Sequence, residues 1–163
     1  MWTQGPRPSR TPRRRAFTLV EVLIVVVILG ILATVIIGVF GNNSADASRA
    51  SLKDNLRTMR SALEIYIAQH GNYPSVASFE QQMTQYTDGA GGVSATKTAT
   101  HIYGPYILSM PPLPIGVERG NTGVTTTTYT AGFGWGYDPI SGQLRANLPA
   151  TEVDDQGIAY NTY

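Results

Sequence analysis

The longest apolar run of the chain covers residues 17–40, where only Thr18, Glu21 and Thr34 are polar and no proline occurs. With so few polar positions, the pattern predicts a helix that is apolar on every face. A helix of this length rises to roughly 36 Å, which exceeds the hydrocarbon core of a bilayer at about 30 Å. The sequence therefore predicts a membrane-spanning helix over residues 17–40, preceded by a leader over residues 1–16.

A second pattern, at residues 48–70, has apolar or aromatic side chains at alternating spacings of four and three. This stripe consists of Leu52, Leu56, Met59, Leu63, Tyr66 and His70. It predicts an amphipathic helix whose stripe packs on the rest of the chain, with a short coiled coil as the alternative. We expect Gly71 to end this helix and His70 to be half-buried or capping. Residues 41–44 predict a break or weak point between the two helical segments.

The remainder predicts small elements of both kinds. Residues 78–86 have the spacing of a short helix, and residues 87–100 are typical of a mobile surface loop. Residues 124–137 are rich in Thr and aromatic side chains and predict a strand, followed by a turn at 138–142 and a returning strand at 143–147. In this hairpin, we expect Trp135 and Tyr137 to lie opposite Leu144 and Ala146. The tail at 151–163 is polar and acidic.

Charge is distributed unevenly along the chain. Residues 1–16 contain five Arg and no acid, whereas residues 17–163 contain seven basic and eleven acidic side chains, a net charge of −4. A basic leader before an apolar helix favours retention of the leader in the cytoplasm. The acidic remainder gives no reason from composition to predict nucleic-acid binding. Because the chain has no cysteine, a disulfide and a lipoprotein anchor are both excluded.

Glu21 is unusual because it stands inside the apolar run. A carboxylate within a membrane helix costs on the order of 2.5–3.5 kcal/mol at the bilayer centre and less near the interface. Cleavage between Ala16 and Phe17 would create an α-amino group that a neighbouring copy could pair with Glu21. The alternatives are a plain membrane anchor with an interfacial Glu21, or a signal peptide cleaved after Ala47. An ordinary signal peptide has a much shorter apolar region.

The basic leader, the sequence Ala-Phe-Thr-Leu-Val-Glu at residues 16–21 and the long apolar helix resemble the processing site of type IV pilins and type II secretion pseudopilins. The resemblance implies that a prepilin peptidase cuts between Ala16 and Phe17 and methylates the new amine. It also implies that Glu21 guides assembly. The family more often has Gly before the cut, so Ala16 departs from its usual pattern. The absence of cysteine and the passage at residues 103–114 resemble the major pseudopilins most.

This resemblance implies a pilin-like α+β fold, in which a long N-terminal transmembrane helix continues into a globular domain over residues 41–163 with a short antiparallel sheet. It implies a structural subunit that forms a homo-oligomeric helical filament with other pilins or pseudopilins. An assembly platform in the bacterial inner membrane would build this periplasmic or surface filament. The alternative function is a membrane-anchored exported binding module or enzyme whose N-terminal helix stays uncleaved. The sequence contains no recognisable constellation of catalytic residues, so we expect no enzyme.

Calcium is the one ion that the resemblance suggests, because major pseudopilins bind it in a C-terminal loop. Glu152, Asp154 and Asp155 are hard oxygen ligands of the right kind. The family's calcium loop is not recognisable in this sequence, so solvated charge is the favoured interpretation of these acids. No other cofactor is predicted.

Overall fold

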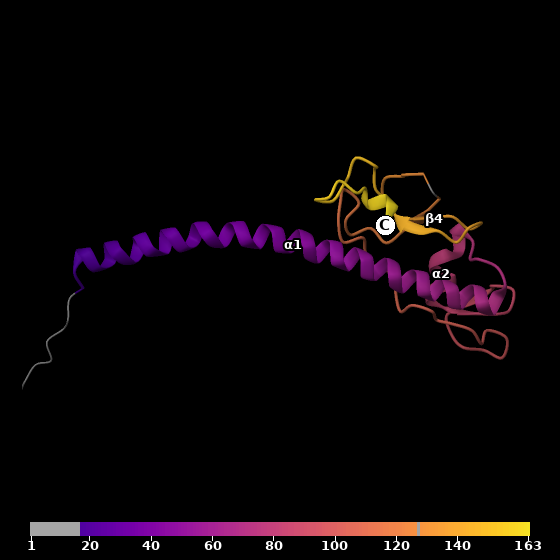
Figure 1. Ribbon diagram of the computed structural model, residues 1–163. Coiled ribbons are helices and arrows are strands. Elements are labelled where there is room, and N and C mark those ends of the chain that lie inside the picture. The colour runs from indigo at the N-terminus through magenta and orange to yellow at the C-terminus, as the bar shows by residue number, and fades with distance from the viewer. Residues whose placement is uncertain (1–16, 127) are drawn as a thin grey trace, which may run out of the picture. The chain divides into compact units, whose positions relative to one another are not determined.

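The computed structural model describes residues 17–126 and 128–163, with no side chains described for residues 35–43. The chain divides into two compact units, one ending at Asn43 and the other comprising Ser44–Tyr163. Helix α1, Leu19–His70, contributes to both units and appears in Figure 1 as one uninterrupted coil. Of the two interpretations of residues 41–44, the break is therefore wrong, whereas the weak point stays a prediction. One Gly in a helix costs only about 1 kcal/mol relative to Ala, and no proline is present to end the helix.

The second unit contains short elements besides the end of α1. They are η1 (Val76–Ser78), α2 (Phe79–Thr84), β1 (Tyr86–Thr87), β2 (Val93–Ser94), β3 (Val124–Thr125), β4 (Trp135–Tyr137), β5 (Leu144–Ala146) and η2 (Tyr160–Thr162). The architecture is α+β, as predicted, with the short helix α2 inside the predicted range. Thr87, which the sequence places in a surface loop, is instead fully buried and pairs with Val93 in a two-stranded antiparallel sheet.

The predicted hairpin is confirmed in its register. Trp135 lies opposite Ala146, and Tyr137 lies opposite Leu144, in the antiparallel pair β4–β5. The connecting turn is closed by a hydrogen bond of 2.9 Å from the Asp138 backbone N–H to the Gln143 carbonyl. Gly142 adopts a φ of 74°, a left-handed conformation that glycine adopts without steric cost.

The rest of the three-stranded sheet differs from the prediction. β3 pairs in parallel with β4, so this sheet is mixed rather than wholly antiparallel. Among the described residues of the predicted strand at 124–137, only those at its two ends form strands. Between them, the Thr130 backbone N–H donates to the Asn147 side chain, and the Gly132 backbone N–H donates to the Glu118 carboxylate. In this segment, backbone N–H groups donate to side-chain oxygens instead of to a neighbouring strand. The segment therefore does not form the strand that its residue types favour.

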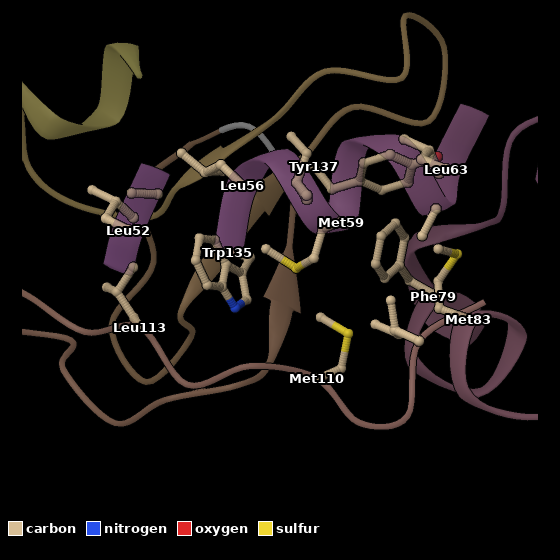
Figure 2. Packing of buried hydrophobic residues seen from close by; sticks show 14 of the residues in the cluster. Leu52, Leu56, Met59, Leu63, Phe79, Met83, Met110, Leu113, Trp135 and Tyr137 are labelled. Atoms are coloured by element: carbon tan, nitrogen blue, oxygen red, sulfur yellow. The ribbon is translucent and has the colours of Figure 1, made fainter. Parts of the chain in front are cut away.

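The hydrophobic core lies where the stripe on α1 meets α2 and the three-stranded sheet. Figure 2 shows side chains from α1, among them Leu52, Leu56 and Met59, gathered beside Trp135 and Tyr137 of β4. All five are at most 1% exposed. Fully burying such a side chain contributes about 1.5–3 kcal/mol, so the predicted stripe is confirmed as the main apolar contact of this unit.

The end of α1 agrees with the prediction for its last residues. Gly71 has a φ of 72°, and its backbone N–H donates to the Ile67 carbonyl. His70 is half-buried, with Nε2 3.0 Å from the Thr87 hydroxyl and 2.9 Å from the Tyr106 hydroxyl. These contacts join the helix end to β1 and to the segment that follows β2, so His70 has a structural role.

Candidate assembly and processing site

The beginning of α1 contains a helix cap that includes Glu21. The Glu21 backbone N–H donates to the Thr18 side-chain oxygen across 3.2 Å and lies 3.1 Å from the Thr18 carbonyl oxygen. Thr18 and Glu21 stand in the T-x-x-E arrangement of a capping box, which satisfies N–H groups that a helix end leaves free. The T-x-x-E signal is readable in the sequence, and the sequence analysis did not use it.

Glu21 occupies the first turn of α1, and its side chain is exposed. An acid at this end of a helix interacts favourably with the helix dipole, by about 0.3–1 kcal/mol when exposed to solvent. Within the described part of the chain, Glu21 makes no ion pair.

Phe17 lies immediately before this cap and is 80% exposed. Ala16, the other residue of the predicted cleavage site, lies outside the described residues. Cleavage, methylation and the assembly role of Glu21 remain predictions.

The apolar side chains at the start of α1 have no cover within their own unit. The large hydrophobic residues from Phe17 to Leu32 are each at least 51% exposed. Isolated exposed apolar residues are ordinary, but a continuous apolar surface indicates an interaction with lipid or protein. Among the helices of the described residues, none is long and apolar enough to cross a membrane.

The three acids considered for calcium have separate intrachain partners. Asp154 accepts hydrogen bonds from the Gln156 and Ile158 backbone N–H groups at 2.8 and 2.9 Å and from the Tyr163 hydroxyl. These bonds, with that of Tyr163 the most important, hold the pKa of Asp154 below its ordinary value. Burial and the same hydrogen bond raise the pKa of Tyr163 to about 12.

The two other acids connect the C-terminal segment to α1 and to the segment around Val117. Asp155 lies 2.7 Å from Arg49 Nη1 on α1, and Glu152 accepts a hydrogen bond of 3.1 Å from the Val117 backbone N–H. The described residues include no group of three or more His, Cys, Asp or Glu that would hold a metal ion. Glu152, Asp154 and Asp155 thus serve as acceptors and ion-pair partners within the fold.

Glu118 is a structural residue that the sequence interpretation missed. It is only 6% exposed, and its carboxylate accepts hydrogen bonds from the Gly132 backbone N–H, the Asn121 side chain and the Tyr129 hydroxyl at 2.7–2.9 Å. These hydrogen bonds lower the pKa of Glu118, and the bond from Gly132 has the largest effect. No local sequence motif predicts this role, because the partners at positions 129 and 132 are 11 and 14 residues further along the chain.

The cap, the exposed apolar helix and the compact α+β unit define a pilin-like subunit. Residues 11–37 match the family described as the prokaryotic N-terminal methylation motif. The chain is 31% identical to type II secretion system core protein G of Klebsiella pneumoniae over 110 residues, covering 65% of this chain and 72% of that protein. The chain belongs to the family of type II secretion system core protein G, and is a structural subunit rather than an enzyme.

Other relatives agree with this assignment over different spans. Core protein G of Aeromonas hydrophila is 29% identical over 64% of this chain and 69% of that protein. The type IV major pilin protein PilA of Myxococcus xanthus is 37% identical over 44% of this chain and 33% of that protein. Core protein G of Pectobacterium carotovorum is matched over only 40% of its length. No solved structure matches the chain.

Family membership makes the chain a pilin-like subunit of type II secretion or type IV pilus filaments. The methylation motif implies processing by a prepilin peptidase, and the family assembles with other pilins. It also indicates an inner-membrane anchor followed by export.

Proposed function

We propose that the chain is a processed filament subunit that crosses the bacterial inner membrane once through residues 17–40. Its unit of residues 44–163 is exported, and many copies form a helical filament on an inner-membrane assembly platform. The observation that carries this proposal is the exposed apolar surface of α1 directly behind a capped start that includes Glu21. Lipid would cover this surface before assembly, and the helices of neighbouring copies would cover it afterwards.

Processing would occur between Ala16 and Phe17. The new, methylated amine of Phe17 in one copy would then pair with Glu21 of another, because a carboxylate surrounded by apolar helices needs a cation. Apolar packing drives assembly in this scheme, and the ion pair selects the arrangement of the copies.

Intact-mass measurement of the subunit extracted from membranes tests the proposal. The expected mass is that of a chain starting at Phe17 with one added methyl group. A mature chain that starts at Ser48 would show cleavage after Ala47 by signal peptidase and would overturn the proposal. An uncleaved chain would favour the plain anchor.

A further inference from the structure

The outer part of α1 and the end of the chain enclose a groove that the proposed function does not explain. It consists of two adjoining hollows of about 410 and 620 Å³, which share Arg60, Glu64, Thr162 and Tyr163. We call it the basic groove, because four of the side chains that line it are basic and only one is acidic. The basic residues are Lys53, Arg57, Arg60 and Arg145, and the acid is Glu64.

This concentration of positive charge stands out against the rest of the subunit. Outside the groove, residues 17–163 contain three basic and ten acidic side chains. The chain therefore combines a positive groove with an otherwise acidic remainder, and opposite potentials attract over distances of about 10 Å at moderate salt.

Contacts within the fold hold part of this charge in place. Arg60 Nε and Nη2 donate to the Leu144 carbonyl oxygen at 3.1 and 2.7 Å. Lys53 Nζ lies 5.0 Å from the centre of the Tyr163 ring, within the range of a cation–π contact. Arg57 is exposed and makes no hydrogen bond or ion pair with any described residue. The groove thus offers a cation to a partner without first breaking an internal contact.

The larger hollow also has apolar lining residues. Leu56 and Tyr163 line the larger hollow together with Ile158, which is 49% exposed. A partner that fits this surface would bring an apolar side chain beside a carboxylate, since aromatic and aliphatic contacts give affinity while charges fix the orientation.

We propose that the basic groove binds an acidic surface of a second copy of this chain in the filament. The inference rests on the proposed function, because a filament supplies copies at close range. A helical array needs heterologous contacts, in which one face of each copy meets a different face of the next. The excess of acidic side chains outside the groove supplies the opposite charge for such a contact.

A matched pair of charge reversals tests this contact. Arg57→Glu reverses a charge inside the groove, whereas Arg119→Glu makes the same change at an exposed residue outside it. Each full-length variant is produced in cells that carry the assembly machinery, and sheared filaments are quantified against processed subunit. We expect Arg57→Glu to lower filament yield roughly tenfold or more, because it places like charges together, and Arg119→Glu to remain within about twofold of the parent. Equal yields for the two variants would overturn the inference.

Cross-linking identifies the molecule that occupies the groove. It also tests the contact if Arg57→Glu folds poorly. Because the chain has no cysteine, Arg57→Cys provides a single attachment point for a photoreactive maleimide in assembled filaments. The expected product has twice the subunit mass and joins position 57 to a peptide that contains an acid. A product with a different protein, or no product in intact filaments, would refute the groove contact. If the parent chain forms no filaments at all, the proposed function itself fails.

Discussion

The side-chain oxygen of Thr18 accepts a hydrogen bond from the backbone N–H of Glu21 at the start of α1. Glu21 therefore belongs to a helix cap and also carries the charge expected to select a neighbour's amine. The bond uses the backbone N–H of Glu21 and the side chain of Thr18, so substitutions at Glu21 remove the charge and substitutions at Thr18 remove the cap.

Glu21→Gln and Glu21→Val both remove the charge and keep the backbone N–H that donates to Thr18. Gln also keeps a polar side chain of similar size, whereas Val is apolar. We expect both variants to insert and to be processed, with Val inserting at least as well as the parent. Both should assemble poorly, because the contact with a neighbour's amine needs the carboxylate.

The measurement is the fraction of variant subunit in sheared filaments when it is co-expressed with an intact copy. Thr18→Ala serves as the control, because it removes the cap at a cost of about 1 kcal/mol and leaves the charge. Normal entry of Glu21→Gln into filaments, together with exclusion of Thr18→Ala, would show that the Thr18 cap, and not the charge of Glu21, governs assembly.

The unit of residues 44–163 should fold without the preceding segment. Its core is made by the stripe on α1, α2 and the three-stranded sheet, all of which lie after Ser44. We expect this fragment to be folded by circular dichroism, and soluble and monomeric by light scattering. We also expect it to show no hydrolytic activity in an enzyme assay. Filament formation by the fragment would contradict the assignment of assembly to the apolar segment.

The stripe on α1 and the hairpin were predictable because their signals are local. Leu52, Leu56 and Met59 follow the helical period, and the Asp138–Gly142 turn fixes which residues of β4 and β5 face each other. Glu118 and the loop it holds were not predictable. Their hydrogen bonds join residues that are 11 and 14 positions apart, and those bonds override the strand propensity of residues 128–134.

The buried stripe gives a direct stability prediction for the fragment. Leu56→Ala removes a side chain that is 1% exposed and should lower the free energy of unfolding by about 2–5 kcal/mol. Ile65→Ala, at a position 51% exposed on the same helix, should cost far less and provides the control. Urea unfolding followed by Trp fluorescence measures both, and similar losses would mean that the stripe is not the main core face.

The Glu118 carboxylate should matter more than its location in a loop suggests. Glu118→Ala leaves the Gly132 N–H and the Asn121 amide without their acceptor, whereas Glu118→Gln keeps one oxygen acceptor in place. We expect the thermal midpoint to fall for both variants, and further for Ala. Hydrogen exchange should localise the change to residues 117–134, and exchange that increases only elsewhere would contradict this role.

Asp154 should make the stability of the fragment depend on pH in the acid range. Its pKa in the folded chain lies below its ordinary value of about 3.9, because the Tyr163 hydroxyl and two backbone N–H groups favour the charged form. The contribution is therefore fully present above about pH 4 and is lost as pH falls through the lower folded-state pKa. Asp154→Asn should reduce the thermal midpoint at pH 7, and the difference from the parent should shrink as the pH falls from about 5 to 2. The control is Asp54→Asn, at an exposed acid on α1 that makes no hydrogen bond or ion pair with the described residues, and it should leave the profile unchanged. A constant difference between Asp154→Asn and the parent at every pH would show that the side chain acts through shape and not through its charge.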